Sequence, residues 1–211
     1  VNLKSEGNRK EMSYTVKVLT EREIAEIYNT YMKQDFPPNE LKPLSHILRS
    51  MEKGYGFCLG LHEKAGLAGY AVFVLWEETG WVLLDYFAIL KDRRGQGLGH
   101  LAFPLFLSYL KEGLPGIESL YIESERVLAA ENETQRRIRE RRIAFYRSCG
   151  CEMTKLRSVL FGVDYSVLYR PIKEAGCGAS KEALDGLYKK MFKPGHYAEF
   201  VSLTEGEIQE A

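Results

Sequence analysis

The chain has 211 residues, of which 45% are hydrophobic and 27% charged, values typical of an ordinary globular protein of one domain with short additions. Its 29 basic and 29 acidic residues cancel, which argues against a general nucleic-acid binder or a protein of the membrane surface. No apolar stretch reaches the roughly 18–20 residues that a membrane-spanning helix needs.

The polar start of the chain does not resemble a signal peptide, and we expect residues 1–13 to be a tail or residues introduced by cloning. Without a secretory signal we expect a cytoplasmic protein whose cysteines are free thiols. The cysteine spacing lacks the paired pattern of a zinc site, and the four histidines are scattered, so no metal is expected. The cysteines are Cys58, Cys149, Cys151 and Cys177.

The first elements in chain order are a strand and two helices. Alternating apolar residues predict a strand over residues 14–19. Thr20 and Glu23 form a capping box that opens a helix through about residue 33. Two successive prolines, at 37 and 38, end this segment, and a second helix is predicted over residues 39–52.

Three strands follow, separated by turn residues. The strands are predicted at residues 57–62, 68–76 and 81–90. The last of them is followed by four charged or polar residues, then by a glycine-rich segment, and then by an apolar helix from Leu98 to about Leu110. Pro104 lies inside this helix, where it forfeits a backbone hydrogen bond, so we expect a kink.

The second half of the chain predicts a strand, a charged helix and a hairpin. The elements are a strand at 117–123, a helix at 132–149, hairpin strands at 153–161 and 165–170, and an extra helix at 180–192. Glutamates alternate with arginines over residues 131–142 and no aromatic residue interrupts them, which predicts a solvated helix face rather than a nucleic-acid surface.

The glycine-rich segment carries the clearest chemical signal. Gly95, Gly97 and Gly99 lie at a turn from a strand to a helix, where glycines let the backbone turn sharply and expose successive N–H groups. These donors and the positive end of the helix dipole suit a phosphate or pyrophosphate. Arg93 and Arg94 add positive charge, so the segment predicts a site for an anionic cofactor.

Two alternatives for this cofactor follow from general glycine motifs. The nucleotide-hydrolase loop is excluded because His100 stands where Lys should follow the glycine. The dinucleotide fingerprint stays open, because residues 97–102 fit its pattern and the acidic Glu123 follows about twenty residues later. Against it, charged residues separate the strand from the glycines, and the motif comes late in the chain.

Two segments in order resemble the GNAT superfamily of N-acetyltransferases. Arg94-x-x-Gly97-x-Gly99 is similar to the family's R/Q-x-x-G-x-G/A loop, which grips the pyrophosphate of acetyl-CoA. Residues 142–151 resemble its A-x-x-F-Y-x-x-x-G-F segment, with Tyr146 at the tyrosine position and Gly150 as a left-handed helix cap. The second segment departs from the family pattern at two positions, where Arg142 replaces the small residue and Cys151 replaces the aromatic residue. Just before it, Arg139 stands where the family often has an asparagine that contacts pantetheine.

The resemblance implies a fold class and a domain plan. The order of predicted elements from residue 14 to about 171 is the GNAT order, so we expect an α/β (α+β) fold in a single GNAT-like domain. Its central mixed, mostly antiparallel sheet would have about seven strands flanked by helices, with a V-shaped splay between the fourth and fifth strands. The expected boundaries are a tail at 1–13, the domain at 14–172 and a C-terminal helical extension at 173–211.

The resemblance also implies the site. Acetyl-CoA would be held by the glycine loop and by the fourth strand, whose backbone near Phe87 and Ile89 would pair with pantetheine and stabilise the oxyanion. The expected cofactor-binding residues are Phe87, Ile89, Arg94, Gly95, Gln96, Gly97, Leu98, Gly99 and His100.

Transfer to an amine needs a base, because an amine with a pKa of about 10.4 is charged at neutral pH. Glu123 is the first candidate for this base and Asp85 is the second, because both are expected on the strands beside the thioester. Glu125 stands at the same strand end as Glu123. Tyr146 would give its proton to the departing CoA thiolate, as the family tyrosine does.

Three functions therefore compete. The first is an N-acetyltransferase that moves the acetyl group of acetyl-CoA to a primary amine of a small molecule or peptide by direct transfer in a ternary complex. The second is a non-catalytic sensor or scaffold that binds acyl-CoA, and the third an NAD(P)-dependent oxidoreductase. Neither nucleic acid nor membrane is an expected partner, a homodimer is left open, and the sequence does not select the acceptor.

Overall fold

A computed structural model describes residues 13–173 and 178–208, so that most of the expected N-terminal tail and Cys177 lie outside the described residues. The described chain forms two compact units. The first contains the chain up to Phe73 together with Asp85–Pro115, and the second contains Val74–Leu84 and the chain from Gly116 onward. The expected boundaries at 14, 172 and 173 stay a prediction.

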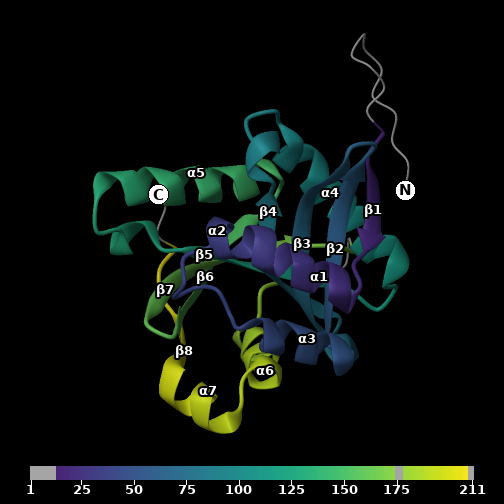
Figure 1. The fold of residues 1–211 in the computed structure, drawn as a ribbon. Coiled ribbons are helices and arrows are strands. Elements are labelled where there is room, and N and C mark those ends of the chain that lie inside the picture. The colour runs from purple at the N-terminus through teal and green to yellow at the C-terminus, as the bar shows by residue number, and fades with distance from the viewer. Residues whose placement is uncertain (1–12, 174–177, 209–211) are drawn as a thin grey trace. The chain divides into compact units, whose positions relative to one another are not determined.

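The strands form a mixed, mostly antiparallel sheet in the order β1-β2-β3-β4-β5-β7-β6-β8, which confirms the expected fold class (Figure 1). The described sheet has eight strands where about seven were expected, because a further strand follows the last predicted helix. The strands are β1 Thr15–Val18, β2 Gly56–Glu63, β3 Gly66–Trp76, β4 Trp81–Ile89, β5 Ser119–Glu125, β6 Glu152–Leu160, β7 Val163–Pro171 and β8 Val201–Glu205.

In the first unit, helices α1 (Glu21–Ile27) and α3 (Leu44–Glu52) lie over one face of β2 and β3 (Figure 1). The predicted capping box opens α1. The segment from α1 to α2 (Lys33–Asp35) stays helical, but five residues in its middle, Tyr28–Met32, form a π-helical turn that the sequence did not reveal. Such turns interrupt the α-helical ladder and are frequent near functional sites.

The second predicted helix begins later than expected. Helix α3 starts at Leu44 rather than at residue 39, and Pro43 caps it. A proline has no N–H, and it disfavours helical geometry in the residue before it, so residues 39–42 cannot continue a helix into α3. These residues instead form an irregular segment that two tyrosine hydroxyls hold, as described below.

Helix α4 (Leu98–Gly113) completes the first unit and follows the glycine loop, as predicted, with Pro104 inside it. Its apolar side chains are buried, among them Ala102, Phe103 and Phe106. The rings of Phe103 and Phe106 pack on Phe87 of β4, which anchors the helix on this strand.

The second unit is built around the parallel pair β4–β5 and the hairpin β6–β7. Trp81–Leu84 pair with Ser119–Ile122 in parallel register, and β5 pairs with β7 in antiparallel register. Phe161 and Gly162 connect the hairpin strands with positive φ angles of 50° and 84°. Because a positive φ is strained for phenylalanine, the stacking of Phe161 on Phe200 at 5.0 Å helps to fix the turn.

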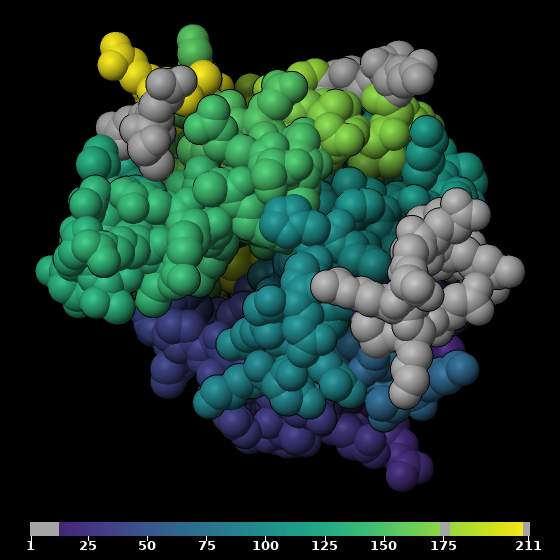
Figure 2. Space-filling view, turned by 90° about the horizontal axis from the view of Figure 1, so that it is seen from above, coloured from purple at the N-terminus to yellow at the C-terminus, as the bar shows by residue number. Residues whose placement is uncertain are grey.

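Helix α5 (Glu133–Ser148) is the predicted charged helix, and its first half is largely exposed (Figure 2). Its arginines pair along the helix, as Arg136 does with Glu133 and Glu140, in agreement with a solvated face. Ile138 is 42% exposed, whereas Ile143 of the same helix is buried in the core. Gly150 has a φ of 79°, the expected left-handed cap.

The C-terminal segment contributes more than the predicted helix. Helix α6 (Lys181–Met191) lies on the opposite side of β5, β7 and β6 from α5 (Figure 1), and it is followed by α7 (Pro194–Phe200) and then β8. The Tyr121 hydroxyl donates to the carbonyl of Ser180 at 2.8 Å and accepts from the Ser180 N–H at 2.7 Å. A buried residue of β5 therefore fixes the start of α6.

Gly186 of α6 is expected to tolerate no side chain. A Cβ built at this position would come within 1.5 Å of the Trp76 ring, whose indole N–H is bound to Glu78. Alanine favours an isolated helix by about 1 kcal/mol, but overpacking costs about 1–3 kcal/mol, so the clash should dominate. We expect Gly186→Ala to lower the free energy of unfolding, measured by urea titration.

Gly113 at the end of α4 provides the control for this substitution. A Cβ at Gly113 would meet the Tyr109 ring at 3.5 Å, an ordinary contact. Gly113→Ala should therefore leave stability unchanged or slightly raised, and equal effects of the two substitutions would contradict a tight packing of α6 on Trp76.

Candidate functional site

The glycine loop has the backbone geometry of an anion site. Gly95 and Gly97 have φ angles of 75° and 76°, and nothing lies within 4 Å of a Cβ built at either. Gly97 is the N-cap of the 16-residue helix α4 and makes no side-chain cap hydrogen bond. The positive end of the helix and the space in front of the loop backbone are therefore available to a phosphate group.

Arg94 holds this loop in place. Its Nε donates to the carbonyl of Ile89 at 2.8 Å, and its Nη2 pairs with the carboxylate of Asp35, which also accepts the Tyr70 hydroxyl at 2.7 Å. Arg93 pairs with Glu63 at 2.6 Å. Both arginines are therefore neutralised by carboxylates of the same unit, and Arg94 links the loop to β4 and to α2.

The other expected cofactor residues lie around this loop. Leu98 is buried, whereas Gln96 and His100 are exposed, and the His100 N–H donates to the Gly97 carbonyl at 3.1 Å. The Phe87 ring is directed toward α4. Any contact of Phe87 with pantetheine would therefore use its backbone.

Asp85 lies at the start of the part of β4 that belongs to the first unit, and it forms an ion pair. Its Oδ1 lies 2.5 Å from Nζ of Lys42, and the Asp85 side chain is only 10% exposed. Lys42 belongs to the irregular segment before α3, where helix was expected from sequence. The candidate base therefore has an internal primary amine as its partner.

Glu123 on β5 accepts two hydrogen bonds in the second unit. Its Oε1 lies 2.5 Å from the hydroxyl of Ser158 on β6 and 2.5 Å from the hydroxyl of Tyr188 on α6. Both donors are fully buried. Burial, followed by the negative charge of Glu123, raises the pKa of Tyr188, so that its hydroxyl stays a donor to the carboxylate.

Glu125, two residues along the strand, belongs to a different cluster. Its carboxylate accepts from Arg139 at 2.9 Å and from Arg142 at 2.7 Å, and Arg139 also donates to the carbonyl of Arg126. The two arginines that depart from the family pattern thus fix α5 on the end of β5. No sequence signal identified this pairing, because its members are 14 and 17 residues apart.

Tyr146 lies on the buried face of α5 and is 6% exposed. Its ring packs edge-on against Phe145 with 5.1 Å between centroids, and its carbonyl accepts from the Cys149 and Cys151 N–H groups. Burial raises the pKa of Tyr146 above its ordinary value, while the charge of Arg142 acts in the opposite direction. The side chain is therefore protonated at neutral pH, the form that a proton donor needs.

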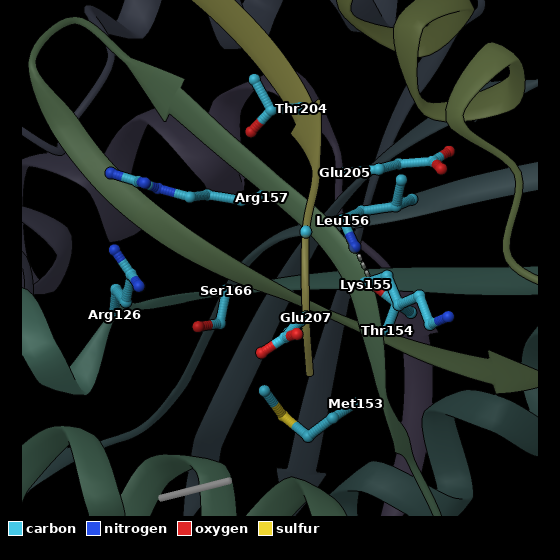
Figure 3. A pocket seen from close by; sticks show the side chains of 11 residues that line it. Arg126, Met153, Thr154, Lys155, Leu156, Arg157, Ser166, Thr204, Glu205 and Glu207 are labelled. Carbon is cyan, nitrogen blue, oxygen red and sulfur yellow. Dashed lines mark hydrogen bonds between the residues drawn. The ribbon is translucent and has the colours of Figure 1, made fainter. Parts of the chain in front are cut away.

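A small pocket of about 160 Å³ lies in the second unit between β6, β7 and the end of β8 (Figure 3). Its two guanidinium groups, of Arg126 and Arg157, both pair with Asp164. None of the predicted catalytic or cofactor residues lines this pocket. It is a separate hollow, beside the irregularity in β6 between Met153 and Arg157.

Comparison with known families decides the assignment. The model of the acetyltransferase (GNAT) family matches residues 22–151, more than half of the chain, and this span contains the glycine loop, Asp85, Glu123 and Tyr146. The chain belongs to the GNAT acetyltransferase family. Members use acyl-CoA, so the enzyme is an acetyltransferase. The glycine fingerprint of dinucleotide-binding enzymes belongs to a doubly wound parallel sheet, whereas this sheet is mixed and mostly antiparallel, which rules out the oxidoreductase alternative.

Solved structures share the fold of this acetyltransferase at low sequence identity. The ribosomal-protein-S18-alanine N-acetyltransferase of Escherichia coli is 19% identical with a TM-score of 0.56, covering 79% of this chain and 99% of its own. A spermidine N-acetyltransferase of Vibrio cholerae, in complex with CoA and spermine, is 11% identical with a TM-score of 0.57, covering 75% and 95%. A protein of Bacteroides thetaiotaomicron assigned to the GNAT family is 16% identical with a TM-score of 0.63, covering 88% and 98%.

A search of curated proteins finds no match to the acetyltransferase. Within residues 13–173 and 178–208, none of its helices is both long and apolar enough to span a membrane. The same residues contain no group of three or more His, Cys, Asp or Glu side chains arranged to hold a metal ion. Cys58, Cys149 and Cys151 are free thiols, and burial raises the pKa of Cys58 and of Cys151 to about 12.

Proposed function

We propose that this acetyltransferase moves the acetyl group of acetyl-CoA to a primary amine of a small molecule or peptide by direct transfer in a ternary complex. The observation that carries the proposal is the glycine loop, whose open backbone with two positive φ angles begins α4. Backbone amides at a helix start favour a pyrophosphate, because their N–H groups and the helix dipole attract its negative charge. The family assignment supports acetyl-CoA as the donor.

The first unit contains the groups proposed to hold the donor. The amides of residues 95–99 would bind the pyrophosphate, and the backbone of β4 at Phe87 and Ile89 would pair with pantetheine like an added strand. An amide of the same stretch would stabilise the oxyanion that forms at the thioester carbonyl. Arg94 acts indirectly, by tying the loop to Ile89 and Asp35.

Two carboxylates and one tyrosine are proposed for the proton transfers. Glu123 or Asp85 would take a proton from the acceptor ammonium, directly or through a water molecule. Tyr146 would donate to the CoA thiolate. Each carboxylate already has hydrogen-bond partners that orient it, Ser158 and Tyr188 for Glu123 and Lys42 for Asp85.

The proposed acceptor is a primary amine, and two observations bear on this choice. Two of the structural neighbours are N-acetyltransferases for spermidine and for an alanine of ribosomal protein S18, so proteins of this fold include enzymes for a small amine and for a residue of a protein. The aromatic residues Tyr28, Tyr31 and Phe36 pack in or against the core of the first unit, and we propose that this region lines the acceptor site. Tyr55 lies near the start of β2.

The proposal is tested by incubating the protein with acetyl-CoA and a panel of primary amines, polyamines and peptides while free CoA is measured. Amine-dependent release of CoA supports N-acetyl transfer and identifies the acceptor. Binding of acetyl-CoA without release in any arm would favour the non-catalytic sensor or scaffold.

Gly97→Val should weaken acetyl-CoA binding by several-fold or more, measured by titration calorimetry. The β-branched side chain strains a position with a φ of 76° and fills the space that the phosphates need. Gly99→Val, within the first turn of α4, should act in the same direction.

Gly54 is the matched control for Gly97. It has a φ of 73° and open space around it, but it lies in the turn after α3. Gly54→Val should carry a similar backbone strain without changing the affinity for acetyl-CoA. Equal affinities of folded Gly97→Val and wild-type protein would exclude the loop as the pyrophosphate site.

A further inference from the structure

Lys42 places a primary amine on a candidate catalytic carboxylate. Its Nζ lies 2.5 Å from Oδ1 of Asp85 and 5.9 Å from the centre of the Tyr86 ring. A carboxylate and an aromatic face are the two groups that stabilise an ammonium ion most directly. The Lys42 side chain is 22% exposed, so the pair is largely shielded from solvent.

The segment that carries Lys42 is held by hydrogen bonds to its backbone. The Tyr86 hydroxyl accepts from the Lys42 N–H at 2.8 Å and donates to the carbonyl of Glu40 at 2.8 Å. The Tyr28 hydroxyl donates to the carbonyl of Lys42 at 3.0 Å. Phe36 packs edge-on against Tyr86 at 4.9 Å. These contacts fix the backbone and leave the lysine side chain to reach Asp85.

The pair belongs to the same unit as the proposed donor site. Asp85 directly precedes the stretch of β4 that contains Phe87 and Ile89, and the glycine loop follows this stretch. We propose that Lys42 is an internal acceptor and that the enzyme acetylates its own Lys42 side chain. This inference rests on the proposed function, because it needs acetyl-CoA bound along β4.

The reaction is the ordinary acyl transfer with an internal amine. The Lys42 ammonium gives one proton to Asp85, and the neutral nitrogen forms a bond to the thioester carbonyl carbon. The carbon–sulfur bond breaks, and the thiolate takes a proton from Tyr146. The new amide nitrogen loses its second proton to solvent, and Tyr146 regains from solvent the proton that it gave. Asp85 returns its proton to solvent. The products are Nε-acetyl-Lys42 and CoA, so atoms and charges balance.

Exposed lysines provide an internal comparison for this reaction. Lys53 and Lys111 are exposed residues of the same unit. Acetyl-CoA reacts slowly with any lysine in solution, and exposure favours that background reaction, so Lys42 should be among the least modified lysines if no catalysis occurs. Catalysis reverses this order, because an oriented intramolecular amine has a high effective concentration.

The experiment incubates the full chain with acetyl-CoA, without added amine, and follows acetylation of each lysine by peptide mass spectrometry. We expect Lys42 to be acetylated about tenfold or more faster than Lys53 and Lys111. The rate constant should not depend on protein concentration. Gly97→Val and Tyr146→Phe should reduce the rate at Lys42 and leave those at Lys53 and Lys111 unchanged.

A parallel arm with the amine panel separates the two possible failures. Release of CoA with an added amine, together with a Lys42 rate no higher than that of Lys53, would overturn the inference and leave the proposed function standing. Absence of both reactions would overturn the proposed function itself. A Lys42 rate that rises in proportion to protein concentration would overturn the intramolecular reaction. In Lys42→Arg, which keeps a cation beside Asp85, the acetylated peptide assigned to Lys42 should disappear while acetylation of Lys53 and Lys111 is unchanged.

Discussion

Tyr146→Phe is expected to lower kcat by about 10²–10⁴-fold, toward the smaller end of this range, while leaving the affinity for acetyl-CoA nearly unchanged. The Tyr146 side chain is 6% exposed and its ring packs against Phe145, and phenylalanine keeps that packing, so the substitution removes only the hydroxyl. The effect should be modest within the range because a CoA thiolate, with a conjugate-acid pKa near 8.5, leaves without full protonation. Steady-state kinetics with saturating acceptor measure it.

The pH profile gives a second readout for Tyr146. Because burial raises the pKa of Tyr146 above the ordinary value of about 10, the hydroxyl stays protonated throughout the neutral and mildly alkaline range. The wild-type profile of kcat should therefore show no loss of activity from this group below about pH 10. A loss there would have to come from another residue.

Tyr121→Phe is the matched control for Tyr146→Phe. It also removes one buried tyrosine hydroxyl of the second unit, but this hydroxyl is bound to the backbone of Ser180. We expect a loss of stability of about 1–3 kcal/mol from the unpaired groups, and turnover close to wild type in the folded fraction. Full turnover in Tyr146→Phe would show that its hydroxyl is structural.

The second large effect concerns the base. If Glu123 is the base, Glu123→Gln should lower kcat/KM for the acceptor by about 10²-fold or more and remove the acidic limb of its pH profile. Glutamine keeps an oxygen that accepts from Ser158 and Tyr188, so the buried arrangement should persist. Calorimetry should show unchanged binding of acetyl-CoA.

Asp85→Asn separates the two candidates by the same measurement. Asparagine keeps an oxygen that can accept from Lys42, and only the negative charge is lost. If the acidic limb survives in Glu123→Gln and disappears in Asp85→Asn, the base is Asp85. If it survives in both variants, the acceptor loses its proton to solvent, and neither carboxylate is the base.

Local sequence patterns predicted much of the fold and the family. The strand periodicities, the capping box at Thr20 and Glu23, and Gly150 at the end of α5 are properties of a few neighbouring residues, and the structure contains each of them. The glycine loop also lies between β4 and α4 as predicted. Glycine adopts a positive φ without strain, so glycines at positions 95 and 97 by themselves indicated a turn of this kind. These local patterns, in order, identified the family.

Sequence patterns gave a wrong helix start or missed a strand where a neighbouring proline or a distant pairing partner decided the structure. Residues 39–42 have helical composition, but Pro43 prevents them from joining α3. Ile138 has helical spacing from Phe145, yet its side chain is 42% exposed. Strand β8 was missed because five residues gain strand structure only through pairing with β6.

What only the tertiary structure decided is the set of partners of each candidate residue. Lys42 and Asp85 are 43 residues apart in sequence, Arg94 and Asp35 are 59 apart, and Tyr188 and Glu123 are 65 apart. Sequence alone determined which residue types could bind a pyrophosphate or move a proton. Hydrogen bonds and ion pairs act over a few ångströms, and only the folded chain brings such distant residues that close, so their partners could not be obtained from local patterns.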